Sequence, residues 1–292
     1  MNIKLIATDM DGTLLNYDNK ISDENTDALL ACQQKGIQVM LASGRSYQRL
    51  LPYVSQLQLL KYDGMFLEGN GMGLYSPKTQ ERTIFRQLKI SEVLHLSQYL
   101  ISTGAEIQVY FDDGVYYYIP PAVMEYKRKE RTERNLPDDY PWLGGPWAWL
   151  HDSRDGYPHQ FQIKSFEEID RPVFNKINLV HDSEFLDQHI PELKKVLGSD
   201  YQLLKSCPRV VELIPSGISK GSALKYYMDR HGISPEEVVV FGDGENDISM
   251  FLESSASVAM GNATDDVKRK AAYVTSSNTE NGIAAFLKKY VL

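Results

Sequence analysis

The sequence predicts an α/β protein with a doubly wound, mostly parallel, Rossmann-like core sheet and an inserted α+β domain. Short apolar runs have the length and composition of buried parallel strands. They lie at residues 3–7, 37–42 and 238–241. Polar residues and then a helical pattern follow each run, which is the order of a β-α unit.

The β-α alternation is interrupted once. It stops near residue 86 and resumes after Pro215, with helices and antiparallel strands between. We therefore expect a core at residues 1–85 and 212–292 and an inserted domain at residues 86–211.

The pattern of residues 3–42 predicts a strand, a helix and a second strand. Ser22 is suited to cap a helix over residues 22–35, which Gly36 ends. The second strand, at 37–42, leads into Ser43 and Gly44. Both strands then end at the same edge of the sheet, where open α/β sheets bind ligands.

The next segment predicts a further helix and a hairpin. Residues 46–59 have apolar side chains at helical spacing, and Pro52 within them predicts a kink or a late start. A short strand at 64–67 leads into a glycine-rich turn, and residues 74–75 and 83–85 are expected to pair.

In the inserted domain, the sequence pattern predicts helices at 91–103, 121–135 and 183–197. The strands are expected at 106–111, 115–119, 174–180, 201–205 and 210–214. The charged residues 125–134 are expected to form the solvated face of a helix. Residues 140–161 hold all three tryptophans, Trp142, Trp147 and Trp149, and read as an ordered loop. This loop either stacks on a ring of the substrate or packs within the domain.

The alternation of the core resumes at Ser219, which opens a helix that Gly232 ends. The strand at 238–241 runs into the sequence GDGEND at 242–247, and a helix begins near Ile248. Later elements are expected at 257–260, from 264, at 273–274 and at 279–290.

Composition narrows the functional class. The chain of 292 residues has a net charge of −8, which argues against nucleic acid as a partner. Cys32 and Cys207 are too few for a disulfide framework. No segment has the length of a membrane span, and no secretory signal is visible. We expect a cytoplasmic, soluble protein, either a monomer or a homodimer, that acts on a small molecule.

The residues at the strand ends indicate phosphoryl chemistry. Asp9 and Asp11 are close enough to repel each other, so a cation, backbone donors or a proton must stabilise them. With a divalent cation, Asp9 could attack phosphorus and Asp11 could protonate the departing oxygen. The alternative is a turn in which Asp and Gly are only turn formers.

Lys220 at a helix start and Asp243 at a strand end could complete such a site with Mg²⁺. Taken singly, Lys220 could be an exposed helix residue and Ser43 a simple helix cap. An EF-hand loop starting at Asp243 fails because Ile248 stands where glycine is needed.

Four clusters in this order resemble the haloacid dehalogenase superfamily, and within it the Cof-type phosphatases with a class IIB cap. They are DMDGT at 9–13, SGR at 43–45, SKG at 219–221 and GDGEND at 242–247. The resemblance extends over essentially the whole chain and implies that the inserted domain is a substrate-specificity cap.

The resemblance also implies residue roles. Asp9 would be the nucleophile that forms an aspartyl-phosphate, and Asp11 the general acid and then base. Mg²⁺ would be held by Asp9, the Asp11 carbonyl and Asp243, with Asp247 bound directly or through water. The implied phosphate contacts are the Met10 backbone, Ser43, Gly44, Lys220 and Asn246.

The expected activity is Mg²⁺-dependent hydrolysis of a small phosphomonoester, with sugar phosphates as the first candidates. A sugar phosphomutase would use the same aspartates. A phosphosugar- or metal-binding regulator that has lost turnover is a third possibility. Arg45 matches the resemblance but has no assigned role.

Overall fold

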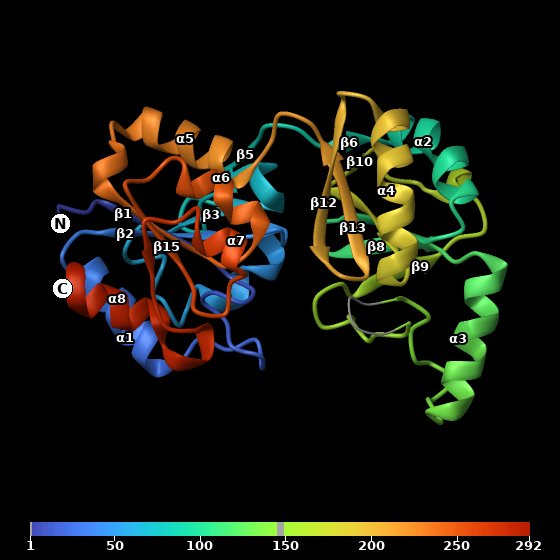
Figure 1. Cartoon of the computed structure of the whole chain (residues 1–292), viewed down its shortest axis with the longest axis horizontal. Coiled ribbons are helices and arrows are strands. Elements are labelled where there is room, and N and C mark those ends of the chain that lie inside the picture. The colour runs from blue at the N-terminus through green and yellow to red at the C-terminus, as the bar shows by residue number, and fades with distance from the viewer. Residues whose placement is uncertain (1, 145–148) are drawn as a thin grey trace. The chain divides into compact units, whose positions relative to one another are not determined.

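The computed structural model describes residues 2–144 and 149–292, which form two compact units (Figure 1). The first unit joins Met1–Arg86 to Gly217–Leu292, and the second is Gln87–Ser216. The strand at the end of the second unit, Val210–Pro215, pairs with strands of that unit. The second unit therefore continues to Ser216.

The first unit is built on an eight-stranded sheet with the order β16-β15-β14-β1-β2-β3-β4-β5. All neighbours from β16 to β3 are parallel, and β4 and β5 complete an antiparallel edge. The strands are β1 (Leu5–Asp9), β2 (Gln38–Ala42), β3 (Met65–Glu68), β4 (Gly73–Tyr75), β5 (Arg82–Ile84), β14 (Val238–Gly242), β15 (Ala256–Ala259) and β16 (Tyr273–Val274). The predicted doubly wound, mostly parallel sheet is confirmed.

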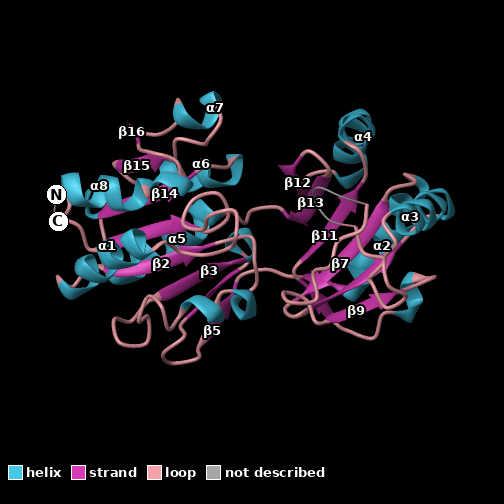
Figure 2. Cartoon of the chain, turned by 90° about the horizontal axis from the view of Figure 1, so that it is seen from below, coloured by secondary structure: helices cyan, strands magenta, loops and turns pink. Residues whose placement is uncertain are grey.

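Helices cover both faces of this sheet (Figures 1 and 2). Apolar side chains of α1 and α8 pack on one face, and those of α5, α6 and α7 pack on the other. The helices are α1 (Asp23–Gln34), α5 (Lys220–His231), α6 (Ile248–Phe251), α7 (Asp265–Lys268) and α8 (Gly282–Tyr290). Burial on both faces explains why the central strands are continuously apolar.

One predicted helix of the core is wrong. Residues 46–59 form two single 3₁₀ turns, at Tyr47–Arg49 and Leu51–Tyr53. Pro52 has no N–H to donate, so the second turn cannot continue the first as an α-helix. By contrast, the caps predicted at Ser22 and Ser219 are present, each accepting a backbone N–H.

The second unit is built on a six-stranded mixed sheet with the order β12-β13-β11-β7-β8-β9. A two-stranded sheet, β6 with β10, lies beside it. The strands are β6 (Leu88–Lys89), β7 (Glu106–Phe111), β8 (Gly114–Tyr118), β9 (His159–Gln162), β10 (Val173–Phe174), β11 (Lys176–Val180), β12 (Tyr201–Cys207) and β13 (Val210–Pro215). Helices α2 (Ile90–Ser102) and α4 (Ser183–Leu197) pack on one face of the larger sheet.

Helix α3 (Pro121–Glu133) packs on the opposite face, over β7 and β8. The predicted solvated face of this helix needs one correction, because Lys127 has 0% exposed surface. Its ammonium pairs with the carboxylate of Glu106 on β7. The charge run therefore includes a buried residue that a charge count alone does not reveal. Helix α2 has Lys89 as its N-cap residue and begins at Ile90, one residue before the predicted range 91–103.

The tryptophan-rich segment is described only in part. Trp147 lies outside the described residues. The guanidinium of Arg131 lies over the Trp142 ring at 4.2 Å from its centroid, and that of Arg209 lies over Trp149 at the same distance. Each ring thus already packs against a cation of the protein, as cation–π pairs do. Stacking of this segment on a substrate stays a prediction.

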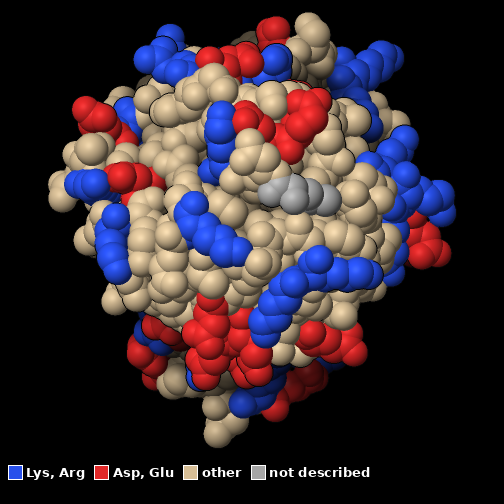
Figure 3. All heavy atoms as spheres, turned by 90° about the vertical axis from the view of Figure 1, so that its left-hand side faces the viewer, with Lys and Arg blue, Asp and Glu red and all other residues tan. Residues whose placement is uncertain are grey.

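On the face of the molecule that Figure 3 shows, basic and acidic side chains are interspersed, and neither charge predominates. Within the described ranges, no helix combines the length and apolar character that crossing a bilayer requires.

Candidate active site

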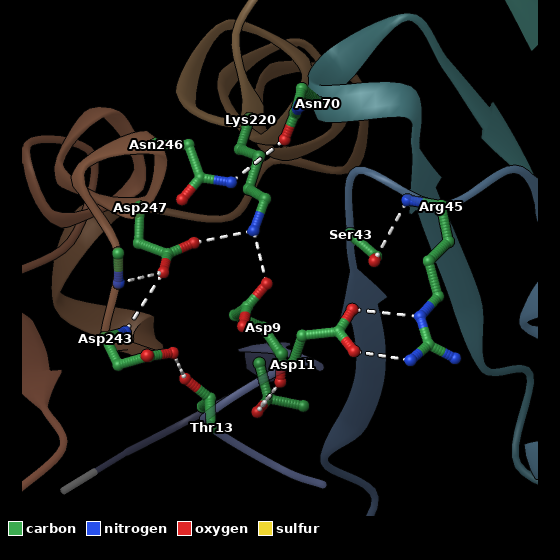
Figure 4. Close-up of polar contacts among 12 residues, drawn as sticks. Asp9, Asp11, Thr13, Ser43, Arg45, Asn70, Lys220, Asp243, Asn246 and Asp247 are labelled. Atoms are coloured by element: carbon green, nitrogen blue, oxygen red, sulfur yellow. Dashed lines mark hydrogen bonds and ion pairs between the residues drawn. The ribbon is translucent and has the colours of Figure 1, made fainter. Parts of the chain in front are cut away.

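The site lies in the first unit, where the carboxyl ends of neighbouring parallel strands meet. Asp9 is the last residue of β1, and the strands beside it are β2 and β14. Ser43 follows β2 directly and Asp243 follows β14 directly. Parallel pairing therefore brings residues from opposite ends of the chain to one edge of the sheet (Figure 4).

Lys220 is the central cation of the site. It begins α5 behind the Ser219 cap, and only 1% of its surface is exposed. Its Nζ donates a hydrogen bond to Oδ1 of Asp9 and another, of 2.7 Å, to Oδ1 of Asp247. The charges of these two aspartates raise the pKa of Lys220 despite its burial, so it stays protonated.

Asp247 organises the loop after β14. Its Oδ2 accepts hydrogen bonds from the backbone N–H groups of Asp243, at 3.0 Å, and Gly244, at 2.9 Å. Its other oxygen accepts from Lys220. Both oxygens of this carboxylate are therefore engaged by donors of the protein itself.

Asp243 is held from the loop that follows Asp9. The hydroxyl of Thr13 donates to its Oδ1 at 2.6 Å. Gly12, the residue before Thr13, has φ +83°, and a Cβ on it would lie 2.3 Å from Oδ2 of Asp243. Only glycine therefore allows the two loops to approach this closely.

The acidic side chains outnumber the nearby cation. Ligand oxygens of Asp9, Asp243 and Asp247 all lie within 4.8 Å of one another, with the single ammonium of Lys220 among them. Burial, and then the charge of Asp247, raise the pKa of Asp9 well above its usual value. Burial raises the pKa of Asp243 to about 6. An oxygen-rich group with excess negative charge is the donor set that a hard divalent cation requires.

The side chain of Asp11 contacts Arg45 and not Lys220. Figure 4 shows its carboxylate turned toward Arg45, whose Nε donates to Oδ2 at 2.9 Å and whose Nη2 donates to Oδ1. Partial burial acts to raise the pKa of Asp11, but the Arg45 hydrogen bond and charge outweigh it and lower that pKa. Tyr53 and Asn19 also bond the guanidinium, which fixes its position.

The remaining predicted residues lie around Asn70. Its backbone N–H donates to the carbonyl of Ser43 at 2.9 Å, and its Oδ1 accepts from the Asn246 amide at 3.0 Å. A Cβ on Gly44 would lie 3.1 Å from the Asn70 amide. Asn70 itself is buried with φ +56°, a conformation that asparagine tolerates.

The first unit thus contains every residue that the sequence predicted for the site. Asp9, Lys220, Asp243 and Asp247 form one contact network. Ser43 and Asn246 are linked through hydrogen bonds to Asn70, beside which Gly44 lies. The Met10 side chain is buried in the hydrophobic core, which leaves only its backbone for ligand contacts.

Sequence reasoning assigned no role to four contributors, namely Thr13, Arg45, Asn70 and Asn262. The Asn262 amide donates to the carbonyl of Gly12 at 2.8 Å. Thr13 and Arg45 are the last residues of the motifs at 9–13 and 43–45, and this position is a usable signal. Asn70 and Asn262 lie in turns remote from those motifs, and nothing in their local sequence indicates the contacts that they make.

Residues 6–287 match the family profile of haloacid dehalogenase-like hydrolases. Among characterised relatives, the chain is similar to 5-amino-6-(5-phospho-D-ribitylamino)uracil phosphatase YwtE of Bacillus subtilis. The two are 30% identical over 295 residues, which is 98% of this chain and 97% of YwtE.

Solved structures agree with this similarity. A haloacid dehalogenase-like hydrolase from Bacteroides thetaiotaomicron superposes with a TM-score of 0.77 and 28% identity, over 98% of this chain and 99% of that one. The subclass IIB sugar phosphatase BT4131 superposes with a TM-score of 0.72 over 98% of both chains. At 22% identity, the second comparison establishes the fold alone.

Proposed function

The chain belongs to the family of haloacid dehalogenase-like hydrolases and is a phosphatase of that family, and from this premise we propose that it hydrolyses small phosphomonoesters through an aspartyl-phosphate on Asp9. The observation that carries the proposal is the buried contact of Lys220 with Asp9 at the end of β1. A buried ammonium beside a carboxylate opposes the rise in pKa that burial causes and attracts the phosphate that the carboxylate attacks.

The reaction then has two steps. The Asp9 carboxylate forms a bond to phosphorus, and the bond from phosphorus to the ester oxygen breaks, with Asp11 giving its proton to the departing alcohol. A water molecule next gives a proton to Asp11 and attacks phosphorus, which releases phosphate and restores Asp9. The Arg45 contact lowers the pKa of Asp11, so Asp11 has to leave that contact and take up a proton before it can act as the acid.

The side chains of Asp9 and Asp243 and the backbone carbonyl of Asp11 are the proposed holders of Mg²⁺. The excess of carboxylates over ammonium groups supports this choice. When bound, the cation would neutralise charge on the phosphate oxygens. Asp247 is proposed to act beside it, directly or through water, because its oxygens already accept from Lys220 and two backbone N–H groups.

The proposed phosphate contacts are the backbone of Met10, Ser43, Gly44, Lys220 and Asn246. Ser43 and Gly44 directly follow β2. The backbone N–H of Ser43 donates to the Leu67 carbonyl, so its hydroxyl is the proposed donor to a phosphate oxygen, together with the backbone N–H of Gly44. The connection of Asn70 to Ser43 and Asn246 supports one binding surface for the anion.

The second unit is proposed to be the cap that selects the substrate, and a sugar or sugar-alcohol phosphate is the proposed class. YwtE, the relative described above, is named for a substrate with a phosphorylated ribityl chain. We place the activity in the cytoplasm, on small metabolites rather than nucleic acid, in agreement with the acidic composition.

The test is hydrolysis of p-nitrophenyl phosphate and sugar phosphates with Mg²⁺ and after chelation, in the wild type and in Asp9→Asn. We expect the substitution to lower kcat by on the order of 10³-fold or more, because the covalent nucleophile is lost. Chelation is expected to abolish turnover, and added Mg²⁺ to restore it.

Product analysis separates the alternatives. A phosphomutase would convert one sugar phosphate into its isomer when primed with a bisphosphate, whereas a phosphatase releases inorganic phosphate. A binding protein would release none. Near-normal turnover in Asp9→Asn would refute the covalent mechanism.

A further inference from the structure

The turn that follows β15 lies beside the proposed metal site. β15 runs parallel to β14, and residues 260–262 follow it as Asp243 follows β14. The backbone N–H of Met260 donates to the Gly242 carbonyl at 3.0 Å, which continues the contact between the two segments to the ends of the strands. This turn is therefore fixed next to the loop that carries Asp243.

Asn262, in this turn, contacts both loops that carry proposed metal ligands. Its Nδ2 donates to the Gly12 carbonyl at 2.8 Å. The same nitrogen lies 3.5 Å from Oδ2 of Asp243, at the long limit of a hydrogen bond. Gly12 follows Asp11, whose backbone carbonyl is one proposed ligand, and the Asp243 carboxylate is another. A single amide therefore links the two loops.

A second asparagine fixes the orientation of this amide. The backbone N–H of Asn278 donates to Oδ1 of Asn262 at 3.0 Å, so the NH₂ end of the Asn262 amide faces Gly12. The Nδ2 of Asn278, a residue only 4% exposed, donates to the Leu15 carbonyl at 2.8 Å. The two asparagines thus bind the loop after β1 at two of its carbonyls.

The loop after β1 has weak support of its own at this point. The backbone N–H groups of Thr13 and Leu14 donate to carbonyls of Met10 and Asp9 at 3.3 Å, which is longer than a typical backbone hydrogen bond. Gly12 adds the conformational freedom of a residue without a side chain. The hydrogen bond from Asn262 to the Gly12 carbonyl restrains the loop at its least constrained residue.

We propose that Asn262, held by Asn278, is a positioning residue for Mg²⁺, which keeps the Asp11 carbonyl and the Asp243 carboxylate in the relative position that this ion requires. The inference rests on the proposed function, which places Mg²⁺ at these residues. Asn262 itself does not bind the ion, because its oxygen accepts from Asn278 and its nitrogen is a donor. Removing a residue that holds metal ligands in place typically changes the affinity by about 10–100-fold.

The choice of ion gives a measurement that a purely structural role would not change. Mg²⁺ requires a near-ideal octahedral arrangement of oxygen ligands, whereas Ca²⁺ accepts a flexible one. Loss of a residue that only positions ligands should therefore weaken the binding of Mg²⁺ more than that of Ca²⁺. Partial unfolding of the site would weaken the binding of both ions alike.

The test is calorimetric titration of the substrate-free protein with Mg²⁺ and, separately, with Ca²⁺, in the wild type and in Asn262→Ala. We expect the Kd for Mg²⁺ to rise about tenfold and the Kd for Ca²⁺ to rise by less than about threefold. The Mg²⁺ concentration that gives half-maximal turnover of p-nitrophenyl phosphate should rise by the same factor as the Kd for Mg²⁺.

The matched control is Gln56→Ala. Gln56 is also an exposed amide of the first unit, and its Nε2 donates to the Ile21 carbonyl at 3.0 Å. Both variants remove an amide that bonds a backbone carbonyl, so both should lower the melting temperature of the metal-free protein by a similar, small amount. Only Asn262→Ala is expected to change the Kd for Mg²⁺.

The outcomes separate this inference from the proposed function. An unchanged Kd for Mg²⁺ in Asn262→Ala, or an equal rise in Kd for both ions, would overturn the inference and leave the proposed function in place. A wild type that binds no Mg²⁺ would instead refute the metal site of the proposed function, and the inference with it.

Discussion

The two units use buried lysines in opposite ways. In the first unit, Lys220 is shared between Asp9 and Asp247, with Asp243 nearby, so negative charge is in excess. In the second unit, Lys127 is equally buried but has one carboxylate partner, Glu106, and the local charge is balanced. Composition alone gives no sign of this difference, since both lysines begin or occupy charged helices.

The contrast separates a site that can do chemistry from one that holds a fold together. An unbalanced group of carboxylates is unfavourable without a cation, so its presence in a folded protein indicates ligand binding. A balanced pair is satisfied as it stands, and breaking it mainly costs stability. The following experiments test whether the two lysines differ in this way.

The largest effect is expected for Lys220→Met. The variant keeps the aliphatic stem and removes the ammonium that contacts Asp9 and Asp247. We expect kcat/KM for p-nitrophenyl phosphate to fall by about 10³-fold, which corresponds to about 4 kcal/mol. Steady-state kinetics at saturating Mg²⁺ measure it. A loss smaller than about threefold would mean that Lys220 has no part in the reaction.

Lys127→Met is the counterpart in the second unit. We expect it to destabilise that unit by about 3 kcal/mol, because the carboxylate of Glu106 stays buried without its cation. Urea unfolding followed by tryptophan fluorescence measures this, since Trp142, Trp147 and Trp149 all belong to the second unit.

The control for this prediction is the double variant Lys127→Met with Glu106→Gln. Glutamine removes the charge and still accepts the N–H of Gly144, so most of the lost stability should return. Turnover of the single variant in the absence of urea should stay close to that of the wild type. A loss of turnover as large as that of Lys220→Met would remove the distinction between the two lysines.

The sequence predicts the first unit better than the second for a physical reason. In the core, each functional residue directly follows an apolar strand or opens a helix, so its position in the fold can be derived from local pattern. Asp9, Ser43, Lys220 and Asp243 all follow this rule. Their convergence then follows from parallel strand pairing.

The contacts that the sequence did not predict share a cause. The Lys127–Glu106 pair joins a helix to a strand with many residues between them, and Asn70 reaches Ser43 and Asn246 through a turn. Such contacts depend on tertiary packing, which residue spacing does not encode. The 46–59 segment failed differently, because its apolar spacing fits a helix while Pro52 prevents one.

Asn70→Gly sharpens the comparison within the core. Glycine adopts the positive φ of Asn70 without strain, so the variant removes only the side chain that accepts from Asn246. We expect about a tenfold rise in KM, and in the inhibition constant of inorganic phosphate, with a smaller change in kcat. The control is Asn135→Gly, at an exposed residue of the second unit with φ +50°, which should change neither constant. An unchanged inhibition constant in Asn70→Gly would show that Asn70 does not position the phosphate contacts.

The smallest effect concerns the cation itself, and it tests the charge imbalance without catalysis. If Asp9 and Asp243 hold Mg²⁺ only in the folded chain, Mg²⁺ at five times its Kd should stabilise the first unit by about 1 kcal/mol. Thermal unfolding at constant ionic strength, with Na⁺ replacing Mg²⁺ in the reference, measures this shift. Asp243→Asn should abolish most of it, because a charged ligand oxygen is lost from the group that includes Asp9. Glu212→Gln, which alters a carboxylate of the second unit, should leave the shift intact. Equal stabilisation of the wild type and Asp243→Asn would mean that Mg²⁺ acts at another place, and the excess of carboxylates around Lys220 would then need a different explanation.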